Sequence, residues 1–282
     1  MRKFGLIGHP LGHSLSPQIH TRLFELSGEK VDYQLYDIAP EELSGKFAFL
    51  ETLDGINITI PHKMGIMDYC DELSDGAKRY RSVNCVKNGE KKTGYNTDVD
   101  GFTKSIEMLG ASLCSDVLLI GCGGVGRMMA IETALCGGNL TIAHLPSDKP
   151  LADAVISEIK AQKPDAKVST VVINGGTLDV SDFDGDVKYD LLLNACPVGM
   201  FPKTDRMPCT PEVLDGVKFV FDVIYNPNVT LLAKTAAEKG AKVMTGMAML
   251  VLQAVAAHEI WDGASYDKAD IDRLIADMEA LV

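Results

Sequence analysis

Short apolar runs alternate with longer helical patterns along almost the whole chain, and this alternation limits the possible folds more than any other feature. Apolar runs bounded by glycine, proline and polar clusters are typical of buried strands, and their alternation with helices is typical of βαβ units. The sequence therefore predicts an α/β protein built on parallel sheets. The predicted strands are Phe4 to Ile7, Tyr33 to Ile38, Ile56 to Ile60, Val83 to Val86, Val117 to Ile120, Leu140 to Ala143, Val168 to Val172, Leu191 to Asn194 and Phe219 to Val223.

The chain is long enough for two domains, because its 282 residues exceed the roughly 100 to 200 residues of a usual single domain. A helix predicted over 99–109 leads into the strand 116–120 and a glycine cluster, where a second α/β unit begins. From Gly246 the pattern is helical to Val282, which is too short for a domain of its own. We therefore predict one domain over 1–100, completed by 247–282, and a second over 101–246.

The chain is acidic, with 39 aspartate and glutamate residues against 27 lysine and arginine residues and a formal net charge of −12. This balance argues against nucleic-acid binding, which requires a basic face to displace counterions from phosphates. A bound anion remains compatible with it, because a helix N-terminus can hold a phosphate. The apolar stretches near the N-terminus and over 246–257 are shorter than a signal-peptide core and a bilayer span, so we expect neither export nor membrane insertion.

Cysteine and histidine spacing indicates no metal site and no disulfide framework. The cysteines are odd in number and include no Cys-x-x-Cys pair, so a reducing cytoplasm fits best. His9, His13 and His20 lie close in sequence, but Pro10 and Gly12 break any helix that would align them. No cysteine or carboxylate lies nearby in sequence, and we therefore predict no bound metal.

The cluster Gly121-Cys122-Gly123-Gly124-Val125-Gly126 has glycine at the first, third and sixth positions of Gly-x-Gly-x-x-Gly. It follows a predicted strand and precedes a helix predicted over 127–136, which is the context of a dinucleotide site. Glycines there allow a tight turn, close approach of a pyrophosphate and packing of the helix on the strand. A simple packing turn is the alternative, but the strand and helix on either side favour a Rossmann-type dinucleotide site.

Neither of the usual residues that select between NAD and NADP is present after the second predicted strand of this unit. About twenty residues after the first glycine, an acidic residue would hold a ribose hydroxyl and an arginine would hold a 2′-phosphate. The chain has Ala143-His144-Leu145-Pro146 there, with Lys149 as the nearest other cation. We therefore expect a preference within about tenfold, with a weak lean to NAD at neutral pH.

Polar residues lie on one face of the strand predicted over 56–60. The strand period of two places Asn57 and Thr59 on one face and the isoleucines on the other. Pro61 stops the strand and suits a helix start, so Lys63 is predicted in the first turn of a helix, where the helix dipole disfavours its charge. This position makes Lys63 a candidate general base, although a single lysine is more often a solvated surface residue.

Two further residues have both a structural and a chemical interpretation. Asp98 precedes the helix predicted from Val99, so an N-cap role would explain it without any chemistry. Ser16 before Pro17 likewise matches an N-cap with proline at the first helical position. Ser14 has no such structural reason.

Taken together, these residues resemble the shikimate/quinate dehydrogenase family over nearly the whole chain. The opening Gly8-His9-Pro10-Leu11-Gly12-His13-Ser14-Leu15-Ser16-Pro17, with His20, is similar to the start of the family. The Asn-x-Thr-x-Pro-x-Lys pattern is met by Asn57, Thr59, Pro61 and Lys63. The other matching segments, in family order, are 96–98, the glycine cluster, 194–200, 222–227 and 246–254.

The resemblance implies an oxidoreductase that interconverts shikimate and 3-dehydroshikimate with NADP or NAD, in aromatic amino-acid biosynthesis. It also implies that the first domain, with the C-terminal helices, binds substrate and that the second is a Rossmann-type cofactor domain. Lys63 and Asp98 would form the catalytic pair. A secondary alcohol that loses hydride must also lose a proton, which a lysine can take while a carboxylate orients and balances it.

The same resemblance assigns the binding residues. The substrate carboxylate would be bound by Ser14 and Ser16, assisted by Tyr225. The ring hydroxyls would be bound by Asn57, Thr59, Asn84, Asp98 and Gln253. The cofactor would be bound by Gly121, Cys122, Gly123, Gly124, Val125, Gly126, His144, Asn194, Cys196, Val223, Gly246 and Met247.

The chain departs from the family in three places. Ser82-Val83-Asn84-Cys85 replaces Ala-Val-Asn-Thr, Cys196 replaces the threonine of Asn-Ala-Thr-Pro, and the Asn-Arg-Thr that often grips a 2′-phosphate is missing. Two alternatives stay open, a quinate-preferring enzyme and a catalytically silent regulator that binds the same ligands. Serine rather than threonine at position 16 favours shikimate, and the pair Lys63 and Asp98 argues against silence. The oligomeric state is left open between monomer and homodimer.

Overall fold

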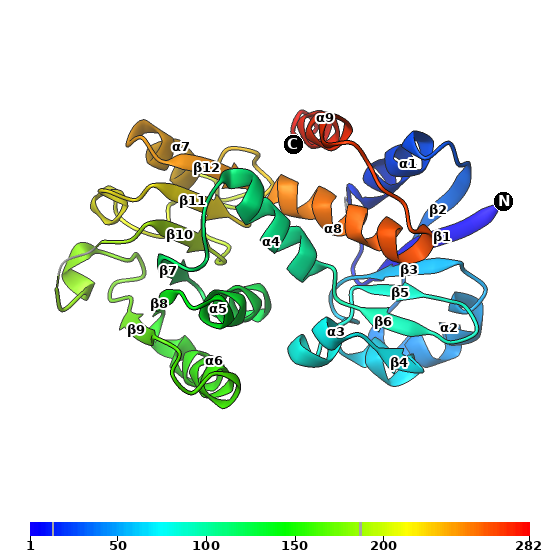
Figure 1. Ribbon diagram of the computed structural model, residues 1–282, viewed down its shortest axis with the longest axis horizontal. Coiled ribbons are helices and arrows are strands. Elements are labelled where there is room, and N and C mark those ends of the chain that lie inside the picture. Colours follow the sequence, from blue (N-terminus) through cyan, green and yellow to red (C-terminus); the bar gives the residue numbers. More distant parts are fainter. Residues whose placement is uncertain (13, 186–187) are drawn as a thin grey trace. The chain divides into compact units, whose positions relative to one another are not determined.

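The computed structural model describes residues 1–12, 14–185 and 188–282, so His13 of the opening motif lies outside the described residues. The chain divides into two compact units. The first comprises Met1–Phe102 and Leu250–Met278, and the second comprises Thr103–Met249 and Glu279–Val282 (Figure 1). The α/β class predicted from the alternating pattern is confirmed, with one sheet in each unit.

The sheet of the first unit has the strand order β2-β1-β3-β5-β6-β4. Its strands are β1 (Arg2–Gly8), β2 (Val31–Asp37), β3 (Gly55–Ile58), β4 (Glu72–Leu73), β5 (Cys85–Lys87) and β6 (Thr93–Tyr95). β1 is parallel to β2 and β3, but β5 is antiparallel to both β3 and β6. The expectation of a purely parallel sheet was therefore wrong here, because the short loop over 88–92 leaves no room for a crossover helix.

Side chains alternate along β1 between two hydrophobic clusters, which shows that both faces of this sheet are buried. Phe4 and Leu6 belong to a cluster with Phe24 and Trp261, whereas Ile7 belongs to another with Ile56. The helices of this unit are α1 (Ser16–Leu26), α2 (Leu43–Leu50), α3 (Asp75–Tyr80) and α9 (Lys268–Glu279), with the 3-10 helices η1 (Pro40–Glu42) and η2 (Gly65–Tyr69). Among the described residues, α4 (Asp98–Leu109) and α8 (Gly246–Asp262) contribute residues to both units, and the last residue of α9, Glu279, belongs to the second unit.

The second unit has a fully parallel sheet in the order β12-β11-β10-β7-β8-β9. Its strands are β7 (Asp116–Ile120), β8 (Asn139–His144), β9 (Val168–Val172), β10 (Leu191–Asn194), β11 (Phe219–Asp222) and β12 (Lys242–Thr245). Its helices are α5 (Gly124–Cys136), α6 (Lys149–Gln162) and α7 (Leu231–Glu238), with the 3-10 helices η3 (Pro146–Asp148), η4 (Val180–Asp182) and η5 (Pro211–Leu214). This is the strand order of a Rossmann fold, in which the sequence reverses direction between β7 and β10.

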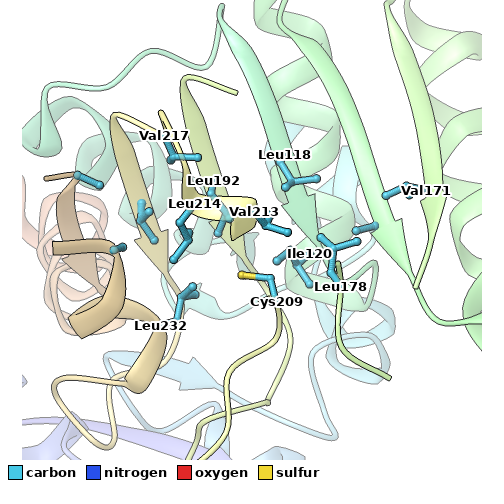
Figure 2. Packing of buried hydrophobic residues seen from close by; sticks show 14 of the residues in the cluster. Leu118, Ile120, Val171, Leu178, Leu192, Cys209, Val213, Leu214, Val217 and Leu232 are labelled. Atoms are coloured by element: carbon cyan, nitrogen blue, oxygen red, sulfur yellow. The ribbon is translucent and has the colours of Figure 1, made fainter. Parts of the chain in front are cut away.

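A continuous hydrophobic cluster holds this sheet together. Leu118 and Ile120 of β7 and Leu192 of β10 pack with Val213 of η5 and Leu232 of α7 (Figure 2). All five side chains are at most 1% exposed. The cluster fixes the strand ends from which the loops of the candidate site emerge.

Several predicted boundaries were wrong. β3 ends at Ile58, so Ile60, expected on the same strand face as Ile56 and Ile58, lies outside the strand and is 73% exposed. The N-cap of α1 is Leu15 rather than Ser16, and no side chain caps this helix. The C-terminal part is interrupted by Gly263, whose φ of +66° ends α8. β4, β6 and β12 were missed, since each has only two to four residues and none is a continuous apolar run.

The cysteines give a further correction. Cys114, in the loop before β7, and Cys136, the last residue of α5, form a disulfide bond. The sequence separation of 22 residues gave no sign of it, because only the βα turn brings these positions together. The free cysteines are Cys70, Cys85, Cys122, Cys196 and Cys209. Among the described residues, no helix is both long enough and apolar enough to cross a bilayer.

Candidate active site

Lys63 and Asp98 form an ion pair in the first unit. Lys63 Nζ and Asp98 Oδ2 lie 2.7 Å apart, and the two side chains are 27% and 20% exposed. The Lys63 carbonyl accepts a hydrogen bond from the Val83 backbone N–H at 2.8 Å, which ties the lysine to the segment before β5. The pair is thus partly buried and fixed, yet open enough for a ligand to reach.

The local structure at Lys63 differs from the prediction. Lys63 lies in a turn, and the following helix is the short 3-10 helix η2, which begins at Gly65. The predicted position in the first turn of a helix was wrong, so the helix-dipole argument does not apply to this lysine. The remaining structural support for Lys63 as a proton-transfer group is its ion pair with Asp98.

Asn84 links the ion pair to the polar residues around it. Its Nδ2 donates to Asp98 Oδ1 at 2.9 Å and to Thr97 Oγ1 at 3.0 Å, and its Oδ1 accepts from the Thr97 backbone N–H at 2.7 Å. Asn84 and Thr97 are 3% and 0% exposed. The carboxylate of Asp98 therefore accepts from an ammonium on one oxygen and from an amide on the other, which fixes its plane.

Gln253 and Thr59, two more residues predicted to bind substrate, lie in the first unit and carry hydrogen-bonding side chains. Gln253 of α8 donates from Nε2 to the Leu250 carbonyl at 2.9 Å and contacts Thr97 Oγ1 through Oε1 at 3.4 Å. Thr59 follows β3 and is half-buried. Thr97 thus connects Gln253 to Asn84 and to the ion pair.

The serines are placed at the start of α1. The Ser16 backbone N–H donates to Ser14 Oγ at 3.2 Å, which uses an acceptor position of Ser14 and leaves its hydroxyl proton to donate. Ser16 is 9% exposed and Ser14 is half-buried. This geometry suits Ser14 as a donor to an anionic group.

The glycine loop of the second unit has the geometry that a pyrophosphate requires. Gly121 has a φ of +95°, and a Cβ on Gly126 would lie 2.3 Å from the Gly121 carbonyl oxygen, so both positions require glycine. A Cβ on Gly123 or Gly124 would meet nothing within 4 Å. Helix α5 begins at Gly124 with no side chain capping it, so its first amides are open to an anion. The residues present fit a dinucleotide cofactor.

His144 does not stand free at the end of β8. It is 2% exposed, and its Nδ1 lies 2.8 Å from the Leu145 carbonyl oxygen. Lys149, the nearest other cation in sequence, is paired with Asp153 of its own helix at 2.7 Å. A 2′-phosphate contact from His144 would require the ring to leave this buried position, so the geometry does not favour it.

Asn194 and Asp222 shape the loops after β10 and β11. Asn194 Nδ2 donates to Asp222 Oδ1 at 2.9 Å, and Thr230 Oγ1 donates to Asp222 Oδ2 at 2.6 Å. Burial raises the pKa of Asp222. The Cys196 backbone N–H donates to Asn194 Oδ1 at 3.2 Å. Asn194 is completely buried, so it would act on a cofactor by holding this loop in place.

The remaining predicted residues lie around the start of α8 and the loop after β11. A Cβ on Gly246 would lie 1.9 Å from the Val223 carbonyl oxygen, so only glycine allows this approach. Met247 is completely buried, whereas Tyr225 is 37% exposed. Within residues 1–12, 14–185 and 188–282, no group of three or more His, Cys, Asp or Glu side chains is arranged to hold a metal ion.

Comparison with known proteins identifies the family. Residues 6–86 match the shikimate dehydrogenase substrate binding domain. Over 274 residues the chain is 39% identical to the shikimate dehydrogenase (NADP(+)) of Methanococcus maripaludis, which covers 93% of this chain and 92% of that protein. The chain belongs to the shikimate dehydrogenase family.

Solved structures of this family and its neighbours share the fold. Shikimate 5-dehydrogenase from Thermus thermophilus, in complex with NADP(H) and shikimate, is 28% identical, with a TM-score of 0.83, over 99% of this chain and 100% of that one. The 5-ketofructose reductase of Gluconobacter sp. strain CHM43 is 26% identical, with a TM-score of 0.85, over 98% of each chain. The fold thus carries more than one named activity, and the substrate must be argued from the side chains.

Sequence analysis did not identify Tyr33 and Thr230, which hydrogen bond to residues of the two candidate sites. Tyr33 contacts Asn57, and Thr230 completes the partners of Asp222. The strand period places Tyr33 on a buried face but cannot show which side chain it meets 24 residues away. Thr230 could have been predicted as a helix N-cap, which it is, since its side chain accepts from the Ala233 backbone N–H.

Proposed function

We propose that this member of the shikimate dehydrogenase family catalyses reversible hydride transfer between shikimate and 3-dehydroshikimate with NADP(H). The observation that carries the proposal is the ion pair of Lys63 and Asp98, with Asn84, Thr97 and Gln253 joined to it by hydrogen bonds. A proton-transfer group surrounded by hydroxyl-binding side chains suits a polyhydroxy acid. The first unit would bind the substrate, and the Rossmann-type unit would bind the coenzyme.

Each residue of the site has a separate role in the oxidation of the alcohol and in the reverse reduction. Bound NADP⁺ supplies the hydride acceptor. As the C3 hydroxyl becomes a carbonyl, the Lys63 amine accepts its proton, and in the reverse direction the Lys63 ammonium donates a proton to the carbonyl oxygen. Asp98, 2.7 Å from Lys63 Nζ, balances the charge that forms on the lysine and holds it in place. Asn84 holds the carboxylate in turn.

The proposal is tested by assay at 340 nm with shikimate and quinate, each with NADP⁺ and NAD⁺. We expect the highest kcat/KM with shikimate and NADP⁺. Equal kcat/KM for the two acids would overturn the ranking of shikimate above quinate. Ligand binding without turnover of either acid would instead favour the silent regulator. Turnover of 5-ketofructose alone would move the chain to the activity named for its structural neighbour.

The coenzyme preference is a separate prediction. Relatives named for NADP(+) favour NADP, against the weak lean to NAD expected from the sequence. The segment 145–149 directly after β8 contains no arginine, and its Lys149 already pairs with Asp153, so recognition of the 2′-phosphate should be weak. We expect kcat/KM for NADP⁺ to exceed that for NAD⁺ by less than about tenfold, or about 1.4 kcal/mol.

Two variants test that explanation. Lys149→Ala should lower the ratio of kcat/KM for NADP⁺ to that for NAD⁺, because Lys149 is the first exposed cation in sequence after β8. His144→Ala should change it little, because His144 is buried. A hundredfold preference for NADP⁺ that neither variant alters would show that other residues recognise the phosphate.

Ser14→Ala should raise the KM for shikimate several-fold or more, with kcat nearly unchanged. The hydroxyl proton of Ser14 is not used by its bond to the Ser16 backbone, and a hydrogen bond to a carboxylate contributes about 1.5 to 3 kcal/mol. Steady-state kinetics against shikimate measure the effect, with Ser44→Ala on the exposed face of α2 as the matched control. An unchanged KM would remove Ser14 from the carboxylate site.

A further proposal concerns the compartment, oligomeric state and partners of the enzyme. We propose a cytoplasmic protein, monomeric or homodimeric, that acts on a small molecule and has no nucleic-acid or membrane partner. The net charge of −12 supports the absence of a nucleic-acid partner. The bond between Cys114 and Cys136 gives no support to the reducing compartment that the cysteine count indicated.

A further inference from the structure

A buried donor in the substrate unit lacks a partner. Asn57 of β3 is 4% exposed, and its Nδ2 makes no hydrogen bond within the described residues. A buried donor without a partner is unfavourable, which indicates an acceptor that comes from outside the chain. The other end of the amide is occupied, because Asn57 Oδ1 accepts from the Tyr33 hydroxyl at 2.8 Å.

The sheet register explains why a tyrosine reaches this amide. Tyr33 of β2 lies opposite Phe4 of β1, and Asn57 of β3 lies opposite Leu6 of β1. Phe4 and Leu6 are two residues apart and share a face, so Tyr33 and Asn57 lie on that same face. The central strand separates them, and only a long side chain can extend across it.

Tyr33 is held rigidly in this position. The His20 ring stacks on it with centroids 4.5 Å apart and planes 9° apart, and His20 Nδ1 lies 3.0 Å from His258 Nε2. Burial raises the pKa of Tyr33 well above its ordinary value, so the hydroxyl keeps its proton and can donate.

A side-chain amide can exchange its oxygen and nitrogen by rotating through half a turn, and a single donor is enough to fix which way it points. We propose that Tyr33 is a positioning residue for substrate binding, which holds Asn57 Oδ1 so that Asn57 Nδ2 is presented to a hydroxyl of the bound acid. Tyr33 does not touch the substrate in this account. The inference rests on the proposed function, because it takes the ligand of Asn57 to be shikimate.

The account also assigns a direction to the hydrogen bonds, since Tyr33 donates to Asn57 and Asn57 donates in turn to the substrate.

The test is a double-mutant cycle on the full chain, with the dissociation constant for shikimate measured by titration calorimetry and KM and kcat by assay. Tyr33→Phe should raise both Kd and KM about three- to tenfold, while kcat stays within about twofold. Because phenylalanine retains the ring that His20 stacks on, the thermal unfolding midpoint should fall little. In an Asn57→Ala background, the same substitution should change Kd less than about twofold.

Tyr36→Phe is the matched control, since Tyr36 lies on the other face of the same strand and should leave Kd and KM unchanged. An unchanged Kd in Tyr33→Phe, an equal effect with and without Asn57, or loss of the fold in Tyr33→Phe would each overturn the positioning role. The wild-type titration keeps the two proposals apart. If wild type does not bind shikimate, the proposed function fails, whereas normal binding by both wild type and Tyr33→Phe contradicts only the role of Tyr33.

Discussion

Lys63→Ala should lower kcat for shikimate oxidation by about 100-fold or more, the usual scale for loss of a general acid or base. Affinity for the substrate should stay within a few-fold, because Asn57, Asn84 and Gln253 do not depend on the lysine for their own hydrogen bonds. Steady-state kinetics with saturating NADP⁺ separate the two parameters.

Lys63→Arg makes this test sharper. Arginine preserves the positive charge beside Asp98 but cannot give up its proton, so this variant should be nearly as impaired as Lys63→Ala. Lys46→Ala, an exposed lysine of α2, is the matched control and should behave as wild type. A near-normal kcat in either Lys63 variant would show that another group accepts the proton.

Asp98→Asn should lower kcat by about 10- to 100-fold, the scale of a hydrogen bond to a charged group. Asp98 accepts from Lys63 Nζ on one oxygen and from Asn84 Nδ2 on the other. An asparagine has only one acceptor oxygen, so one of these donors would face an NH₂ group, and the charge on Lys63 would be unbalanced.

Stability separates the chemical role of Asp98 from a structural one. α4 begins at Asp98, so Asp98 is its first helical residue and not the N-cap that the sequence predicted. For the helix, asparagine there loses only the interaction of a carboxylate with the helix dipole, about 0.3 to 1 kcal/mol, so thermal unfolding of Asp98→Asn should change little. Asp75→Asn, at the first residue of α3, is the control for this kind of position. Intact activity in Asp98→Asn would mean that the helix-start role alone accounts for this residue.

The sequence predicts the parts of the site that depend on local patterns. The strand period predicts that Ile56 and Ile58 share the face opposite Asn57, and in the structure the two isoleucines belong to one hydrophobic cluster that does not include Asn57. The glycine spacing at 121–126 predicts a turn followed by a helix, because both the positive φ of Gly121 and the close packing of Gly126 require glycine.

Local sequence patterns could not predict features that depend on contacts between segments distant in the sequence. The antiparallel pairing of β5 and β6 was missed because Thr93-Gly94-Tyr95 is not an apolar run. Lys63 was placed on a helix because Pro61 suits a helix start, yet the chain forms a turn that is bonded to Val83. The partners of Asp98 were assigned from family resemblance, since 35 residues separate it from Lys63.

The central claim is that this chain removes a hydride from the alcohol carbon of shikimate. The most direct measurement uses shikimate carrying deuterium at C3, with NADP⁺ and the wild-type chain, and follows the label by NMR. The account predicts one deuterium in the nicotinamide ring of NADPH for each molecule of 3-dehydroshikimate formed. Product formation without label in the coenzyme, or no product at all, would contradict it.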